Sequence, residues 1–258
     1  MGTLAEQTAI VTGAGTGIGA CASLRLAAEG AHVVLVGRRR EPLEQTAAGI
    51  HAAGGSATVM PCDLEDGAAA AELGAAVARD RGRIDLLVNN AGHSSRVRSV
   101  RYVSPEEWDS VFKVNVEGVY RLTQAVLPTM LDAGRGTVVT IASVAAINAG
   151  MLGGASYGAA KSAVWSFMRS INAELRNEGI RACTILPAEV DTPILDNRPL
   201  PPDAAARATM MQPEDVADAI VFCATMPQRT LVEQITLLPT HARDVSADIA
   251  AARAQRKP

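Results

Sequence analysis

Tyr157 and Lys161 are the two side chains whose types and spacing point most directly to chemistry. In a helix, residues four apart lie one turn apart on the same face. A tyrosine has a reference pKa of about 10, and a neighbouring cation favours the phenolate and lowers that pKa. The pair therefore predicts that Tyr157 transfers a proton, as an acid in reduction and as a base in oxidation. The alternative is a surface pair on a helix, which is disfavoured because the chain has only three tyrosines and three lysines.

Ser143 is a second candidate, fourteen residues before Tyr157 and just after an apolar run that ends at Ile141. Ligands of doubly wound sheets bind at the carboxyl ends of the strands, where both side chains would then lie. A hydroxyl at this place can donate a hydrogen bond to a substrate oxygen as negative charge builds on it. A lone serine at a strand end is more often a cap or turn residue, and its pairing with Tyr157 makes it a candidate.

The elements that must position these side chains alternate between short β-branched apolar runs and longer stretches rich in Ala, Leu and Glu. The apolar runs are typical of buried parallel strands and cover Thr8–Thr12, His32–Val36, Ala57–Pro61, Ile84–Val88, Thr137–Ile141, Arg181–Leu186 and Gln234–Leu238. The clearest helical stretches are Gly19–Glu29, Leu43–Ala53 and Tyr157–Asn177. This alternation predicts the α/β class, with one doubly wound parallel sheet of seven strands and helices on both faces.

No linker or internal repeat marks a second domain, so residues 1–258 are expected to form a single domain. Ser104 followed by a proline and two glutamates is a helix start. Residues 188–213 are rich in proline and are either a flap over a ligand or an idle surface loop. The tail 241–258 is rich in Ala and Arg, and either packs on a neighbouring subunit or frays.

A glycine-rich turn, Thr12–Gly19, follows the first predicted strand and opens the first predicted helix. Glycines there let the backbone approach a pyrophosphate, and the helix N-terminus directs its N–H groups at the anion. This context predicts a dinucleotide site over a merely tight turn.

The end of the second strand favours NADP(H) as the cofactor, with NAD(H) possible. Sheets that bind NAD usually carry an acid there for the ribose 2′-hydroxyl, whereas this chain has Gly37 followed by Arg38, Arg39 and Arg40. A guanidinium can pair with a 2′-phosphate, so Arg38 is the expected main contact. The alternative is a solvated basic run at a helix start.

Two further strand ends border the same edge. Asp63, which precedes Leu64, either accepts a hydrogen bond from the adenine amino group or caps the next helix. After the fourth strand, small residues and amides in Asn89–Gly92 would allow close packing on the cofactor and pin the strand ends, or form an ordinary turn. His93, directly after them, is a weaker candidate for substrate contact and is more often a structural residue.

Composition excludes several other classes of function. The formal charge is −3, which gives no electrostatic footprint for nucleic acid or for an anionic membrane. The four cysteines are far apart and lack a metal-ligand spacing, so no metal is expected. There is neither a signal peptide nor an apolar run of the length a membrane span needs, so a cytoplasmic protein with a small-molecule substrate is expected.

Taken together, the ordered motifs Thr12-Gly13-x-x-x-Gly17-x-Gly19, Asn89-Asn90-Ala91-Gly92, Ser143 and Tyr157-x-x-x-Lys161 closely resemble the short-chain dehydrogenase/reductase family, over about residues 5 to 240. The resemblance implies a seven-stranded Rossmann fold and a homotetramer or homodimer. It implies that Lys161 binds the nicotinamide ribose and that Asn115 holds a water relay behind it. Expected cofactor contacts are Gly13, Thr16, Gly17, Ile18, Gly19, Arg38, Asp63, Leu64, Asn90, Ala91, Gly92, Tyr157, Lys161, Pro187 and Thr192.

The chain departs from the family pattern after the sixth strand. The usual Pro-Gly is Pro187-Ala188 here, which puts the backbone path in question, although Thr192 fits the family's nicotinamide contact. Glu189 either reads a polar substrate or faces solvent. The last strand lacks the usual glycine pair, and its ending resembles a branch with hydroxy-acid and serine dehydrogenases, without assigning a substrate.

The sequence thus predicts an oxidoreductase that moves a hydride between NADP(H) and a carbonyl or secondary alcohol. A variant of this function uses transient oxidation, as epimerases do, and the single short domain makes it less favoured. A hypothesis from another functional class is a nucleotide-binding regulator without turnover. The presence of all four residues Asn115, Ser143, Tyr157 and Lys161 argues against it. The variable stretches 145–156 and 189–208 are largely small and apolar, and predict a partly hydrophobic substrate pocket.

Overall fold

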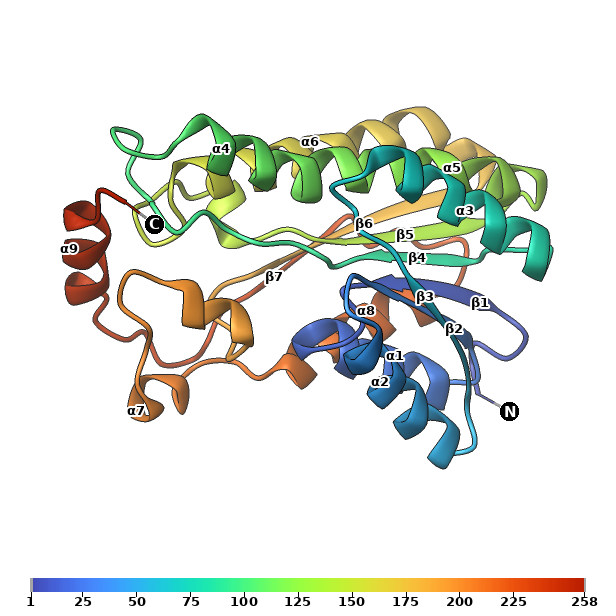
Figure 1. Ribbon diagram of the computed structural model, residues 1–258. Helices are drawn as coiled ribbons and strands as arrows, with labels where there is room; N and C mark the ends of the chain where they lie inside the picture. The colour runs from blue at the N-terminus through green and yellow to red at the C-terminus, as the bar shows by residue number, and fades with distance from the viewer. Residues whose placement is uncertain (1, 258) are drawn as a thin grey trace.

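A computed structural model describes residues 2–257 and contains one seven-stranded, all-parallel sheet (Figure 1). Its strand order is β3-β2-β1-β4-β5-β6-β7. The strands are β1 Thr8–Thr12, β2 His32–Gly37, β3 Ser56–Pro61, β4 Leu86–Asn89, β5 Gly136–Ile141, β6 Ile180–Pro187 and β7 Gln234–Leu237. The order changes direction between β1 and β4, which is where doubly wound sheets bind ligands. The predicted fold class is confirmed.

Helices cover both faces of the sheet. In Figure 1, α3, α4, α5 and α6 lie above it, whereas α1, α2 and α8 lie below. The α-helices are α1 Gly17–Ala28, α2 Arg40–Ala52, α3 Gly67–Arg81, α4 Pro105–Phe112, α5 Val119–Asp132, α6 Ala155–Leu175, α7 Ala204–Arg207, α8 Pro213–Thr225 and α9 Ser246–Ala254. A π-helical segment, η1 Lys113–Gly118, joins α4 to α5, and two short 3₁₀ turns, η2 Val144–Ala146 and η4 Pro193–Asn197, follow β5 and β6.

Alternation along the strands produces two cores from one sheet. In β2, Val33 and Leu35 join the core between the sheet and α1, α2 and α8. Val34 and Val36 join the core between the sheet and α3, α5 and α6. Successive side chains of a strand point to opposite faces, so a strand covered on both sides must be apolar throughout. Four strands, β1, β4, β5 and β6, are buried along their whole length. This burial explains why the strands could be recognised from continuous apolar runs.

Element boundaries differ from the predictions by a few residues. The helix that carries Tyr157 begins at Ala155, two residues earlier than predicted, and the fourth strand begins at Leu86 and not at Ile84. Ser104 caps α4 as expected, because its Oγ accepts a hydrogen bond from Glu107 N at 3.2 Å. The π-helical segment was not predicted.

The proline-rich segment 188–213 lies against the glycine-rich turn. It holds η4 and α7 and is bridged to itself between Val190 and Met211. A Cβ atom built on Gly17 would lie 3.2 Å from Thr192 Cγ2, which shows how closely the segment approaches α1. Segment 188–213, called the flap below, therefore lies beside the glycine-rich turn, and its role over a ligand stays a prediction. The tail is not frayed, because it contains α9.

No helix within the described part of the chain is long and apolar enough to cross a membrane.

Asn172 anchors α6 to a part of β6 that precedes its pairing with β7. Its Nδ2 donates to Ala182 O and its Oδ1 accepts from Ala182 N, both at 2.8 Å. Pairing with β7 begins only at Thr184, so the Asn172 amide takes the place of a strand neighbour for Ala182. The side chain is buried, and the helix that it anchors is the one that carries Tyr157 and Lys161.

We predict that Asn172→Ala lowers the free energy of unfolding by about 2–4 kcal/mol, because it leaves a buried N–H and a buried carbonyl without partners. Urea or guanidinium denaturation of the purified protein measures the loss. Asn177→Ala, at an exposed position just past the same helix, is the matched control and should change the value by less than about 0.5 kcal/mol. Equal effects of the two substitutions would contradict the anchoring role.

Candidate active site

The turn between β1 and α1 has the shape of a pyrophosphate cradle. Gly13 and Gly17 have φ angles of +66° and +53°, which residues with a side chain rarely adopt. A Cβ atom on Gly19 would collide with Gly13 O, so the helix can only come this close to the turn with glycine there. The first turn of α1 directs its free N–H groups into the space above.

A cavity of about 200 Å³ opens next to this cradle, at the carboxyl edge of the sheet. It is lined by Gly13, Gly15, Thr16, Gly37, Arg38, Arg39, Pro42, Leu43, Cys62, Asp63, Leu64, Ala91, Gly92, His93 and Val114. The strand ends after β1, β2, β3 and β4 thus converge on one cleft. Seven of the fifteen residues expected to contact a dinucleotide line it, including Arg38.

The elements of the fold place several of the expected contacts. Thr16 is the N-cap residue of α1, and Ile18 packs on the core beneath the sheet. Pro187 ends β6, and Thr192 precedes η4 against Gly17.

Arg38 and Asp63 lie exposed where β2 and β3 end. Asp63 Oδ1 accepts a hydrogen bond from Glu65 N at 3.1 Å and does not cap α3. The cap of α3 is Asp66, whose Oδ1 accepts from Ala68 N and Ala69 N. The capping alternative for Asp63 is therefore wrong, and its carboxylate faces the cleft.

The amides at the end of β4 pin neighbouring strands, as the sequence predicted. Asn90 Nδ2 donates to Thr12 O at 2.9 Å, and the N–H groups of Asn90 and Ala91 donate to Thr12 Oγ1. Asn89 Nδ2 donates to Thr123 Oγ1 at 3.1 Å. These bonds fix the end of β4 against β1 and α5, and so shape the floor of the cleft.

Ser143 and Tyr157 meet just beyond the end of β5. Ser143 Oγ accepts from Ala145 N at 3.2 Å and caps η2. Burial raises the pKa of Tyr157 above its usual value, while its hydrogen bond with Ser143 and the charges of Arg98 and Arg198 act in the opposite direction. The two hydroxyls therefore lie within hydrogen-bonding reach, and Tyr157 is a phenol at neutral pH.

Lys161 lies one turn further along α6 and is buried. Its Nζ donates to Ile141 O at 2.8 Å and lies 5.5 Å from the centre of the Tyr157 ring. Burial lowers the pKa of Lys161 to about 8. The sequence predicts Lys161 as a cation that lowers the pKa of Tyr157, and Arg98 and Arg198 are two further cations that act in that direction.

Asn115 lies in the π-helical segment η1, close behind the lysine. Its Nδ2 donates to His93 O and to Val111 O, both at 2.8 Å. Its Oδ1 is buried and has no hydrogen-bond partner among residues 2–257. A Cβ atom on Gly92 would lie 3.3 Å from Lys161 Nζ and closer still to Asn115 Oδ1, so both groups face Gly92. An unpartnered acceptor at this place suits a water, and π-helical turns are frequent at functional sites.

His93 borders the cleft and is partly buried. Its Nε2 lies 3.1 Å from Ser110 Oγ, and burial lowers its pKa below the usual value. The ring is therefore neutral at pH 7, and its backbone carbonyl contacts Asn115.

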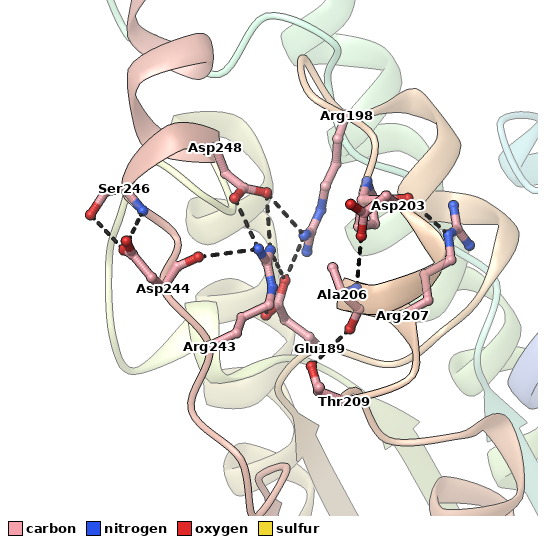
Figure 2. A network of polar contacts seen from close by, with 11 residues as sticks. Glu189, Arg198, Asp203, Ala206, Arg207, Thr209, Arg243, Asp244, Ser246 and Asp248 are labelled. Carbon is pink, nitrogen blue, oxygen red and sulfur yellow. Dashed lines mark hydrogen bonds and ion pairs between the residues drawn. The ribbon is translucent and has the colours of Figure 1, made fainter.

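Glu189 forms an ion-pair cluster with Arg198, Arg243 and Asp248 (Figure 2). Arg198 Nη1 donates to Glu189 Oε1 at 2.6 Å, and Arg243 donates to both Glu189 oxygens at 2.7 and 2.8 Å. Arg243 also makes two 2.9 Å bonds to Asp248. Glu189 is thus neither free to read a substrate nor directed to solvent. Burial raises its pKa, but the bonds from Arg243 and Arg198 outweigh this and hold it below the usual range.

Arg98 and Arg198 are the site residues that sequence reasoning missed. Both come from irregular segments, one before α4 and one after η4, where no spacing rule applies. Both charges act on the pKa of Tyr157, so two cations accompany the small and apolar residues predicted around the substrate. Within residues 2–257, no group of His, Cys, Asp and Glu side chains could hold a metal ion.

Comparison with known proteins gives the same assignment as the geometry. A family model described as short chain dehydrogenase matches residues 7–201. An oxidoreductase of Staphylococcus aureus, described as uncharacterized, is 33% identical over 242 residues, which are 93% of this chain and 100% of the relative. A similar oxidoreductase of Staphylococcus epidermidis is 32% identical over 239 residues, again 93% of this chain and 100% of the relative.

Solved structures of the same type superpose well. A metagenomic short-chain oxidoreductase in complex with NADP is 34% identical, with a TM-score of 0.79 over 93% of this chain and 100% of that chain. Levodione reductase is 28% identical, with a TM-score of 0.83 over 90% of this chain and 96% of that chain. With its parallel sheet, its glycine cradle and the meeting of Ser143 with Tyr157, the chain belongs to the short-chain dehydrogenase family and is an oxidoreductase of that family.

Proposed function

We propose that this protein reduces a carbonyl group, or oxidises the matching secondary alcohol, with NADP(H) as the preferred cofactor. The observation that carries the proposal is the meeting of Ser143, Tyr157 and Lys161 at the sheet edge that also bears the glycine cradle. The metagenomic relative holds NADP, which supports a dinucleotide in this cleft. The cradle fits such a group, because a side chain at Gly19 would fill it.

Tyr157 is the proton donor in reduction and the proton acceptor in oxidation. A bound nicotinamide supplies or accepts the hydride. Ser143 Oγ donates to the substrate oxygen, which stabilises the negative charge that develops there. As a neutral phenol, Tyr157 is in the protonation state that reduction requires.

Lys161 would hold the nicotinamide ribose, and Asn115 would hold a water between that lysine and solvent. Lys161 Nζ already donates one bond to Ile141 O, and an ammonium has three donors, so two remain for the ribose and for a relay. Asn115 Oδ1 is the acceptor that such a water needs. We assign both residues to the proton path on this basis.

The preference for NADP(H) rests on Arg38. This arginine lines the cleft where β2 ends. The residue before it is Gly37, where sheets that bind NAD usually carry an acid. A 2′-phosphate placed there would form charge-assisted hydrogen bonds with the guanidinium. Retention of Asn115, Ser143, Tyr157 and Lys161 in one place favours turnover over a regulator that only binds nucleotide. From the family we further propose a homotetramer or homodimer in the cytoplasm.

Tyr157→Phe is expected to lower turnover by about 10²–10⁴-fold while cofactor affinity stays nearly unchanged, because the substitution removes only the transferable proton. Loss of NADPH absorbance with a panel of ketones, aldehydes and keto acids measures turnover, and fluorescence titration measures binding. Tyr120→Phe, at an exposed tyrosine, is the matched control. Wild-type rates in the Tyr157 variant would refute the mechanism.

Arg38→Ala should weaken NADPH binding by roughly 10- to 150-fold, the equivalent of about 1.5–3 kcal/mol for hydrogen bonds to a charged group. NADH affinity should change little, since NADH lacks the phosphate. Arg40→Ala is the control, because Arg40 is exposed and pairs with Glu44 at 3.6 Å. An equal loss for both cofactors, or tighter binding of NADH by the wild type, would remove Arg38 from this role.

Lys161→Met should change how stability depends on pH. The pKa of Lys161 falls from 10.5 to about 8 on folding, so between these values the unfolded chain binds more protons than the folded one. Stability conferred by this group therefore rises with pH from about 8 to 10.5, and is lowest below pH 8, where a buried charge must be kept.

Between pH 7.5 and 10, the free energy of unfolding of the wild type should rise by roughly 1–3 kcal/mol more than that of the Lys161→Met variant. Lys113→Met removes an exposed lysine and serves as the control. A difference that does not vary with pH would show that burial does not perturb Lys161.

A further inference from the structure

Arg98 is held rigidly in the loop between β4 and α4, with 3% of its surface exposed. Its carbonyl accepts a hydrogen bond from Ala155 N at 3.1 Å, at the start of α6. Its side chain runs over Gly154, where a Cβ atom would lie 2.8 Å from Arg98 Cδ. The stem of the side chain is therefore fixed by the same helix that carries Tyr157.

The guanidinium of Arg98 lacks the partners that a buried arginine requires. Nη1 donates to Gly153 O at 2.8 Å, but Nε is buried and has no hydrogen-bond partner in the described chain. Arg98 takes part in none of the ion pairs found among residues 2–257. Burial, followed by repulsion from Arg198, lowers the pKa of Arg98 to about 10, so the group is still charged at neutral pH.

Arg181 shows what a purely structural arginine looks like in the same protein. It is also buried, and all three of its nitrogens are bonded. Nε and Nη2 donate to Thr137 Oγ1, and Nη1 donates to three backbone carbonyls. Because packing alone leaves Arg181 satisfied, the unpartnered donor of Arg98 calls for a ligand.

The guanidinium of Arg98 lies near Tyr157, the proposed proton donor. Gly153, to which Arg98 is bonded, is in contact with Tyr157, since a Cβ atom there would lie 3.7 Å from Tyr157 Cδ1. The charges of Arg98 and Arg198 both favour the Tyr157 phenolate. Arg198 follows η4 and Arg98 precedes α4, so two cations from separate segments act on Tyr157.

The acids nearby do not compensate Arg98. Glu189 and Asp248 are shared between Arg198 and Arg243, which balances two charges against two (Figure 2). Glu107 attracts Arg98 from a distance beyond an ion pair. Its Oε1 accepts from the N–H groups of Arg96 and Val97, and its Oε2 has no partner among the described residues.

We propose that the substrate carries a carboxylate and that Arg98 binds it beside Tyr157, with Arg198 as a second cation. This assignment rests on the proposed function and narrows it to keto acids and the matching hydroxy acids. The planar fork of a guanidinium matches the two oxygens of a carboxylate. The ligand would satisfy the free Nε donor and neutralise the charge, while the carbonyl of the same molecule reaches Tyr157 and Ser143.

Paired substrates test the proposal directly. Acetoacetate and 4-oxopentanoate are each compared with their methyl esters in NADPH-dependent reduction. The wild type should prefer each acid over its ester by at least about 30-fold in kcat/KM, because the ester lacks the charge. Arg98→Met should reduce the preference for acid over ester by about 30-fold or more, because any loss that acts through the pKa of Tyr157 is shared by both substrates and cancels in their ratio.

Two further variants separate charge from folding. Arg98→Lys keeps the charge but loses the fork, and should retain an intermediate preference for the acids. Arg96→Met removes an exposed arginine of the same loop and should keep the wild-type preference. A variant that binds NADPH with wild-type affinity and melts at the wild-type temperature is counted as folded.

Two kinetic outcomes would overturn the proposal. One is Tyr157-dependent reduction of the esters as efficient as that of the acids, which leaves the proposed function intact. The other is an equal loss for acid and ester in Arg98→Met, which would make Arg98 a positioning residue.

A binding measurement decides the case without turnover. Calorimetric titration of 4-methylpentanoate, with and without NADP⁺, should give a dissociation constant at least about 10-fold tighter for the wild type than for Arg98→Met. Equal affinities would overturn the carboxylate site even if no substrate of the panel reacts.

Discussion

The docking of α6 across β5 and β6 is the constraint on which the site depends. Asn172 bonds both backbone groups of Ala182 near one end of the helix, and Lys161 bonds Ile141 O closer to the other. These polar anchors at two points fix both the position and the rotation of the helix, which apolar packing alone would define less sharply. Tyr157 is held next to Ser143 because the helix that carries it cannot slide along the strand ends.

A second feature is the excess of cations around the Tyr157 hydroxyl. Lys161 and Arg98 are buried, and neither is paired with a carboxylate of the described chain. Burial raises the pKa of Tyr157 while Arg98 and Arg198 oppose that rise, so the phenol remains protonated in the free protein. Keeping unpaired charges in a dry site opposes folding, and such a cost is typical of a site arranged for a ligand.

The sequence predicted those parts of the protein that follow periodic rules. Buried strands were recognisable because both of their faces are covered, the cradle because glycine alone permits its φ angles, and Tyr157 with Lys161 because a helix sets their spacing. The boundaries of the elements were harder to predict, because β4 begins two residues later than expected and α6 begins two residues earlier, at Ala155. The π-helical segment around Asn115 and the convergence of Arg98, Arg198 and Glu189 depend on contacts between distant segments, for which a single sequence has no local signal.

The flap connects the two halves of the site through a short stretch of chain. Thr192 lies against Gly17 in the dinucleotide cradle, and Arg198, six residues later, acts on Tyr157. Arg198 is in turn bonded to Glu189, which Arg243 ties to Asp248 at the start of α9. A displacement of the flap would move Thr192 and Arg198 together. The ion-pair cluster thus explains how irregular segments, without the support of a sheet, hold a charged side chain in place beside Tyr157.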